Sequence, residues 1–216
     1  MGSRHHLAWR AVGLSLMLAL SSAPAAAAVV ALALEINGDT DPALEPFTEI
    51  ESGTSISLGP TTEIEFLHYT TCQTIVVRGG RITFTEQQYL VQKGELVNAN
   101  RTKCPEVAEA GKDSSIGGVL MRGAGDGLKL RPVPQFAFVG ASRSAFNELR
   151  VLKGETVLLT APLESFRFDW PEAKGGLAAG NDYALELIGA GNASKRIEFE
   201  VVERRGTAPL TIIRLD

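Results

Sequence analysis

Apolar and polar residues alternate along most of this chain, and that period of two restricts its possible folds more than any other feature. In VALALEI (30–36), the even-numbered residues Val30, Leu32, Leu34 and Ile36 are predicted to face one way and the odd-numbered residues the other. Similar alternation recurs in QFAFVG (135–140), SFRFDW (165–170), DYALELIGA (182–190) and KRIEFEVVE (195–203). Such alternation is typical of half-buried β-strands. No amphipathic helical pattern exceeds two turns, so an all-β fold is expected.

Two glycine-containing pairs predict tight turns. In TIVVRGGRITFT (74–85), Gly79-Gly80 can adopt the positive φ angles of a two-residue hairpin turn, which would pair Arg78 with Arg81. That pairing puts four apolar side chains on one face, namely Ile75, Val77, Ile82 and Phe84. A second hairpin is expected in YLVQKGELV (89–97), with its turn at Lys93-Gly94.

The strand-rich character is interrupted once. Residues 98–131 hold six glycines and few periodic apolar residues, with one short strand predicted at VLM (119–121). The expected organisation is therefore a small β domain over 29–104, a glycine-rich linker over 105–131, and a β-sandwich-like module over 132–216.

The N-terminus has the pattern of a secretory signal peptide. Arg4 and Arg10 form a basic region, AVGLSLMLAL (11–20) is apolar, and SSAPAAAA (21–28) is rich in small residues. Cleavage is expected after Ala28, which would give a periplasmic or secreted protein without an integral membrane segment. An uncleaved inner-membrane anchor is the alternative, although Pro24 and the short apolar region disfavour a span of about 20 residues.

The net charge disfavours a nucleic-acid partner. Residues 1–28 contain two arginines and no acidic residue, so the remainder has 19 basic and 25 acidic side chains and a formal net charge of −6. An acidic surface is repelled by phosphate backbones and anionic lipid. With 44% hydrophobic residues, the chain is expected to be globular.

The only two cysteines, Cys72 and Cys104, both lie in the exported part. In an oxidising compartment they are expected to pair, so HYTTC (68–72) is interpreted as an anchor of the fold beside a hydrogen-bonded His68. The chemical alternatives are a Cys-His dyad or a zinc site, and both need reduced thiols. No catalytic residue, metal ligand or cofactor is predicted.

The run FTEIESGTSISLGPTTEIEFLHY (47–69), followed by TIVVRGGRITF (74–84), resembles the FecR-type domain of bacterial envelope proteins. The positions that match are Ile50, Gly53, Ile56, Leu58, Ile64, Phe66, Val77, Gly79 and Gly80. The resemblance covers about residues 30–97 and implies a periplasmic β domain. FRFDWPEAKGGLAAGNDYALEL (166–187) weakly resembles fibronectin type III-like modules. The anti-sigma and signalling segments of iron-dicitrate regulators have no counterpart here, so that regulatory role is not implied.

These features together predict an exported, non-enzymatic binding or scaffolding protein of the bacterial cell envelope. Its partner is expected to be another envelope protein, contacted through strand edges and hairpin tips. One alternative is a module that binds carbohydrate or envelope polymer, with Trp170 and Tyr183 as candidate aromatics, although their strand parity predicts that both lie in the core. The other is a hydrolase that uses two carboxylates.

Overall fold

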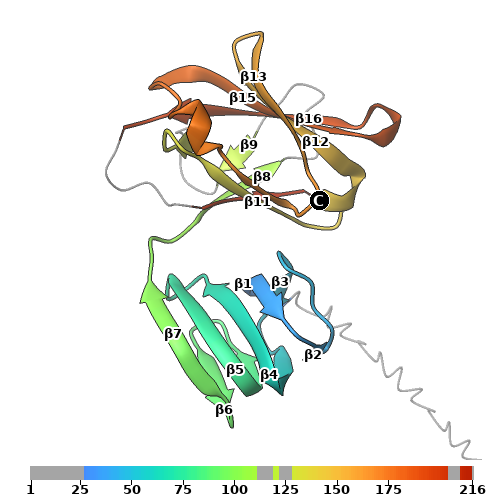
Figure 1. The fold of residues 1–216 in the computed structure, drawn as a ribbon, viewed down its shortest axis with the longest axis vertical. Coiled ribbons are helices and arrows are strands. Elements are labelled where there is room, and N and C mark those ends of the chain that lie inside the picture. Colours follow the sequence, from blue (N-terminus) through green and yellow to red (C-terminus); the bar gives the residue numbers. More distant parts are fainter. Residues whose placement is uncertain (1–26, 111–118, 122–127, 204–209, 216) are drawn as a thin grey trace, which may run out of the picture.

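The computed structural model describes residues 27–110, 119–121, 128–203 and 210–215, and Figure 1 shows their arrangement. The predicted all-β class is confirmed, because these residues form strands joined by turns, with only three short 3₁₀ segments. Most of the predicted signal segment, residues 1–26, lies outside this described part.

The N-terminal module (residues 29–104) is one antiparallel sheet in the order β3-β1-β4-β5-β6, with β2 also pairing with β4 and β7 with β5. Its strands are β1 (Val29–Asn37), β2 (Thr40–Asp41), β3 (Glu49–Glu51), β4 (Ser55–His68), β5 (Gln73–Phe84), β6 (Tyr89–Gln92) and β7 (Glu95–Arg101).

The predicted hairpin at Gly79-Gly80 is wrong. Strand β5 continues through both glycines, which have φ angles of 64° and 76° and kink the strand without reversing it. The facing strand β4 is irregular at the same level, because Leu58 pairs with Gly80 and Glu63 with Arg78 while the residues between them are unpaired. A kink and a two-residue turn both require positive φ, so the glycine pair does not distinguish them.

The predicted hairpin at Lys93-Gly94 is wrong for the same reason. Strands β6 and β7 both run antiparallel to β5, with Tyr89 opposite Phe84 and Glu95 opposite Arg78. The Lys93-Gly94 pair is therefore a second kink, level with the first. The true hairpin turns are residues 69–72, between β4 and β5, and residues 85–88, between β5 and β6.

The aligned kinks fold the sheet into two halves around one core. Half-sheet I contains β3, β1, the second part of β4, the first part of β5, and β7; half-sheet II contains β2, the other parts of β4 and β5, and β6. Phe66 of half-sheet I meets Phe84 of half-sheet II, with ring centroids 4.9 Å apart. The predicted apolar face is correct, because Ile75, Val77, Ile82 and Phe84 are all buried in this core.

The prediction that β1 alternates strictly between its two faces is wrong at two positions. Irregularities in its pairing fall at Val30 and Leu34, and each changes which side the next residue faces. Val30 and Ile36 therefore face the module's own core, whereas Leu32 and Leu34 face the opposite side.

The C-terminal module is a sandwich of two five-stranded sheets. One has the order β10-β16-β15-β12-β13 and the other β14-β11-β17-β8-β9. Their bounds are β8 (Glu106–Ala110), β9 (Val119–Met121), β10 (Leu128–Leu130), β11 (Gln135–Val139), β12 (Phe146–Lys153), β13 (Thr156–Pro162), β14 (Arg167–Asp169), β15 (Gly180–Gly189), β16 (Ser194–Val201) and β17 (Thr211–Arg214). Phe136 from one sheet contacts Phe199 from the other, with centroids 6.4 Å apart.

The prediction of a linker over residues 105–131 is wrong at both ends of that stretch. Strand β8 pairs with β17 and strand β10 with β16, so both belong to the C-terminal module. The short strand predicted at VLM is present as β9. The remaining positions of this stretch, 111–118 and 122–127, lie outside the described residues.

The two modules share a third apolar cluster. The β14-β11-β17-β8-β9 sheet directs Phe136, Phe138 and Ile213 into the sandwich core. Its alternate residues Ala137, Val139 and Ile212 pack with Leu32 and Phe47 of the N-terminal module. That sheet is therefore covered on both faces, and the modules are packed together rather than separated by a free linker.

Candidate functional site

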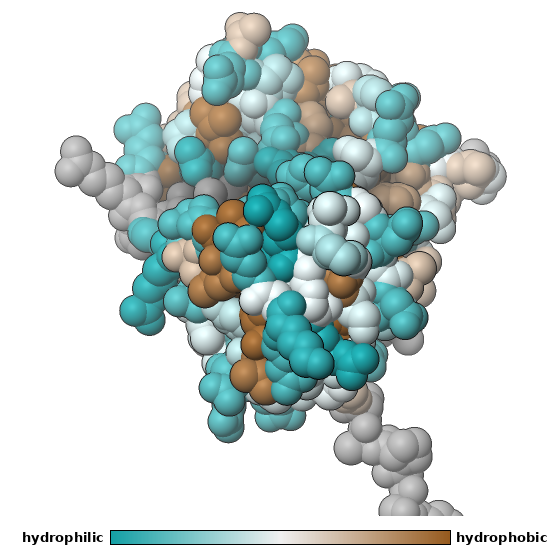
Figure 2. Space-filling view, turned by 60° about the horizontal axis from the view of Figure 1, so that its bottom comes forward, coloured by the Kyte–Doolittle hydropathy of each residue, from teal (hydrophilic) through white to brown (hydrophobic). Residues whose placement is uncertain are grey.

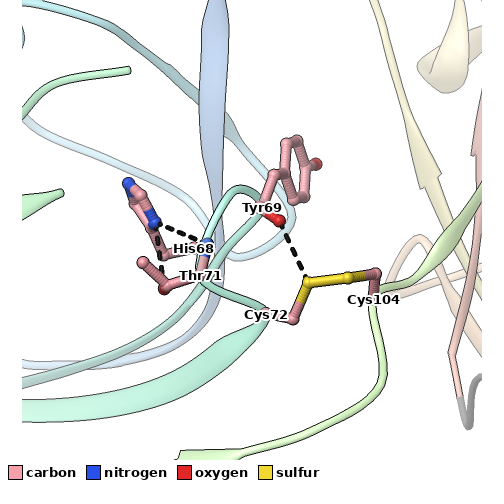
Figure 3. Close-up of a disulfide and its surroundings, with 5 residues drawn as sticks. All are labelled: His68, Tyr69, Thr71, Cys72 and Cys104. Atoms are coloured by element: carbon pink, nitrogen blue, oxygen red, sulfur yellow. Dashed lines mark hydrogen bonds between the residues drawn. A yellow bond between two sulfur atoms is a disulfide. The ribbon is translucent and has the colours of Figure 1, made fainter. Parts of the chain in front are cut away.

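HYTTC covers the last residue of β4 and the hairpin turn that leads to β5. The predicted disulfide between Cys72 and Cys104 is present, with Cα atoms 4.7 Å apart (Figure 3). Cys72 has a φ of 51°, the left-handed conformation needed to close the turn. The amide of Thr102 donates a hydrogen bond to the carbonyl oxygen of Cys72 at 2.8 Å. The disulfide and this hydrogen bond together hold the chain that leaves β7 against the β4–β5 turn.

His68 is fully buried, and both of its ring nitrogens have partners. The amide of Thr71 donates to Nδ1 at 3.4 Å, so Nε2 carries the hydrogen and donates to the carbonyl oxygen of Thr85 at 3.3 Å. Burial lowers the pKa of His68, and the hydrogen bond to Thr85 partly opposes that shift. The neutral His68 ring therefore links the β4–β5 turn, through Thr71, to the β5–β6 turn, through Thr85.

The dyad and zinc interpretations of HYTTC do not match this geometry. Figure 3 shows the His68 ring pointing away from the disulfide, and Cys72 Sγ instead lies 3.3 Å from the carbonyl oxygen of Tyr69. Both sulfur atoms are already bonded to one another. Within residues 27–110 and the other described stretches, no group of three or more His, Cys, Asp or Glu side chains is placed to hold a metal ion.

The disulfide holds the chain directly after strand β7, and β7 is the most exposed strand of the N-terminal module. All seven of its residues are exposed, including Leu96 at 51% and Val97 at 43%. In Figure 1, β7 lies on the left side of the lower module, and Figure 2 shows hydrophobic areas on that side among hydrophilic ones. A strand that exposes apolar side chains among polar ones, and that is open to solvent on both faces, is a candidate binding surface.

One edge of β7 has no partner strand in the described part of the chain. Its residues pair with β5 on one side, from Glu95 opposite Arg78 to Arg101 opposite Gln73. Unpaired N–H and C=O groups along such an edge can accept another strand, and proteins usually protect long edges with lysine, proline or covering elements. β7 contains neither lysine nor proline, although its pairing with β5 is irregular at Val97.

Both ends of β7 are fixed. At its start, Gly94 lies in the kink against Gly79, and at its end the Cys72–Cys104 disulfide holds the following segment. A partner that adds to β7 would therefore meet a pre-ordered strand and would have to order only its own segment. Edge addition of this kind is a common mode of peptide recognition.

Polar contacts made by Arg143 hold the two modules together at their junction. Arg143 donates to the carbonyl oxygen of Phe47 at 2.5 Å, forms an ion pair with Glu45 at 3.3 Å, and lies 4.5 Å from the ring centre of Phe166. Phe47 and Phe166 have φ angles of 61° and 51°, which non-glycine residues adopt only under constraint. A hollow of about 480 Å³ opens beside this group.

A further ion pair crosses the junction. Arg214 of β17 contacts both carboxylate oxygens of Glu49 in β3, at 2.5 and 3.3 Å. The hydroxyl of Tyr69 donates to the same carboxylate at 3.5 Å. Burial raises the pKa of Tyr69, and the negative charge of Glu49 raises it further. These groups fix the orientation of the two modules.

The two aromatics proposed for carbohydrate or polymer binding lie in structural positions. Trp170 and Tyr183 are buried, as their strand parity predicted, and they donate hydrogen bonds to the carbonyl oxygens of Gly175 and Ala178.

Glu35 and Glu65 are opposite one another on β1 and β4. The pKa of Glu65 is raised by burial and then by the charge of Glu35, whereas Arg167 lowers it.

Comparison with protein-family models, with curated proteins and with solved structures finds no match for this chain. The resemblance to FecR-type domains therefore has only the sequence pattern behind it. Among the described residues, no helix has the length and apolar character needed to cross a membrane.

Proposed function

We propose that this protein is an exported, non-enzymatic binding or scaffolding module of the bacterial cell envelope, and that β7 is its docking edge. The observation that carries the proposal is the combination of seven exposed residues, an unpaired edge within the described chain and fixed ends in one strand. A protein segment in extended conformation would add to β7 through backbone hydrogen bonds.

Several features support export. The signal-like N-terminus is followed directly by β1, which begins at Val29, the residue after the expected cleavage point. A disulfide between the only two cysteines is typical of an oxidising compartment. The resemblance of residues 30–97 to FecR-type domains agrees with a periplasmic location.

The side chains of β7 would give selectivity. Leu96 and Ala99 lie opposite Val77 and Ile75 of β5, so they extend the apolar face of half-sheet I beyond its buried part. Asn98 and Asn100 lie opposite Val76 and Thr74 and offer amides on the other face. A partner segment with alternating apolar and polar residues would match both faces.

Co-purification from the envelope of the producing organism tests this proposal. Val97→Pro removes an amide and disfavours strand pairing at the centre of β7, so it should abolish recovery of the partner. The matched control is Val157→Pro, because Val157 is 47% exposed on β13, an edge strand of the other module. Equal recovery with both variants would contradict a docking role for β7.

A further inference from the structure

We propose that the hollow beside Arg143 is a binding site for the carboxylate group of a small organic acid. The hollow measures about 480 Å³, and its walls come from the segments 45–49 of the N-terminal module and 140–144 of the C-terminal module, together with Phe166. Pockets of this size that bind small molecules are often found between domains. None of the described residues that line the hollow belongs to β7, so the site is independent of the proposed docking edge.

Arg143 is the cation that binds the carboxylate. It is the only basic side chain among the described residues that line the hollow, and only 16% of that side chain is exposed. Its partner Glu45, at 3.3 Å, has a side chain that is 79% exposed. Because water solvates Glu45 well, its release from Arg143 costs little, as is usual for ion pairs with an exposed member. The carboxylate of a ligand therefore replaces that of Glu45.

The guanidinium group of Arg143 has N–H donors that the protein does not use. It carries five N–H groups in a planar fork, which matches the two oxygens of a carboxylate. Within the described residues, one N–H is used for the carbonyl oxygen of Phe47 and one for Glu45. A ligand that displaces Glu45 leaves the hydrogen bond to Phe47 in place, so the two modules stay connected through Arg143.

The second carboxylate of the hollow, that of Glu49, does not repel such a ligand. Its side chain is only 15% exposed, and Arg214 contacts both of its oxygens. The hydroxyl of Tyr69 donates a further hydrogen bond to it. The charge of Glu49 is thus compensated within the junction, and the positive charge of Arg143 dominates the hollow once Glu45 turns away.

The walls of the hollow are held in fixed positions. Phe47 and Phe166, which Arg143 contacts, have φ angles of 61° and 51°. The amide of Phe47 donates a hydrogen bond to the carbonyl oxygen of Ala33 at 2.8 Å, and the carbonyl oxygen of Phe166 accepts one from Phe138 at 2.8 Å. Strained backbone of this kind accumulates at binding sites, and a site with fixed walls loses less conformational entropy when its ligand binds. The half-buried ring of Phe166 offers an apolar surface to the hydrocarbon part of the ligand.

Titration with sodium butyrate, followed by amide chemical shifts in NMR spectra, tests this site in the disulfide-bonded protein without the predicted signal segment. Sodium chloride keeps the ionic strength constant, so that screening does not change during the titration. We expect saturable shifts at residues 45–49 and 140–144, with a dissociation constant below about 10 mM, as suits a ligand this small. Butyramide has nearly the same shape without the charge and should bind at least about tenfold more weakly.

Glu45→Gln is the decisive variant. It removes the competing carboxylate and should bind butyrate about threefold more tightly than the wild type does. If the ion pair only held the modules together, this variant would gain no affinity. Arg143→Gln removes the cation and should weaken butyrate binding at least about tenfold.

Glu155→Gln is the matched control for the loss of an acidic side chain. Glu155 is exposed, lies after β12 whereas Arg143 lies before it, and does not line the hollow, so this variant should bind butyrate as the wild type does. Circular dichroism checks that each variant keeps its β structure; if Arg143→Gln loses it, the comparison of Glu45→Gln with the wild type decides. An absence of saturable shifts, equal binding of butyramide, or an affinity in Glu45→Gln no higher than in the wild type would overturn the proposal.

Discussion

Gly80 of β5 and Gly94 at the start of β7 lie against one another across the kinked sheet. A Cβ atom added to Gly80 would overlap the backbone of Lys93 and Gly94, and one added to Gly94 would overlap the carbonyl group of Gly79. This close approach lets neighbouring strands bend at one level, so it determines both the enclosed core and the position of β7, the proposed docking edge.

Replacing either glycine should therefore destabilise the N-terminal module. Gly94→Ala introduces steric overlap at a residue outside the left-handed region, and Gly80→Ala adds the strain of a φ of 76°. We expect losses of roughly 2–4 kcal/mol in the free energy of unfolding for each, measured by urea denaturation.

Gly154→Ala is the matched control, because Gly154 has a φ of 56° and open space around its Cα. It should cost only the left-handed strain, about 1 kcal/mol. Similar losses at positions 80, 94 and 154 would contradict steric contact as the cause.

The same kink explains what the sequence could and could not predict. The buried face of β5 followed from its alternation, because a hairpin and a double-glycine kink both bring Val77 and Ile82 to the same side. The path of the chain did not follow, since local residues do not show whether β5 turns back or continues. That choice depends on Gly94 and the irregular part of β4, which are distant in sequence.

The candidate site was predictable in part. Pairing of Cys72 with Cys104 followed from the signal-like N-terminus and the cysteine count, and the buried positions of Trp170 and Tyr183 followed from strand parity. The exposure of β7 could not be predicted, because Leu96 and Val97 read as half-buried strand residues. Their exposure arises because β7 lies at the margin of half-sheet I, beyond the core.

The disulfide should contribute to stability as a single unit. It closes a loop between cysteines 32 positions apart, for which the chain-entropy estimate is up to roughly 4 kcal/mol. Cys72→Ala, Cys104→Ala and the double variant should therefore lose similar amounts in urea denaturation. A free-thiol assay on the unfolded, unreduced wild-type protein should detect no thiol, and two reactive thiols would contradict the pairing.

Stability should fall as the pH falls through the titration range of His68, the only histidine after residue 28. Its pKa is lowered in the folded protein, while the unfolded chain takes up a proton near the ordinary value of 6.5. Below that pH the unfolded state binds more protons, so the free energy of unfolding decreases until the lowered pKa is reached.

His68→Gln should remove this dependence between about pH 5 and 7, above the range where most carboxylates titrate. The slope of unfolding free energy against pH is the relevant readout, because the substitution also changes stability by itself. An unchanged slope in the variant would show that another group causes the pH dependence.

The shared apolar cluster predicts that the two modules unfold together. Ile82 lies in the N-terminal core, and Trp170, the only tryptophan after residue 28, lies in the C-terminal sandwich. Ile82→Ala should cost about 2–5 kcal/mol and should lower the midpoint of the Trp170 fluorescence transition. An unchanged midpoint would mean that the modules unfold independently.

Photo-crosslinking in the producing organism tests the docking role of β7 most directly. A photoreactive residue is placed at Leu96, Val97 or Asn98, and at Val157 on β13 as the control. We predict covalent adducts in the envelope fraction from the β7 positions, with none from position 157. Adducts absent from β7, or equally abundant at position 157, would contradict β7 as the docking edge.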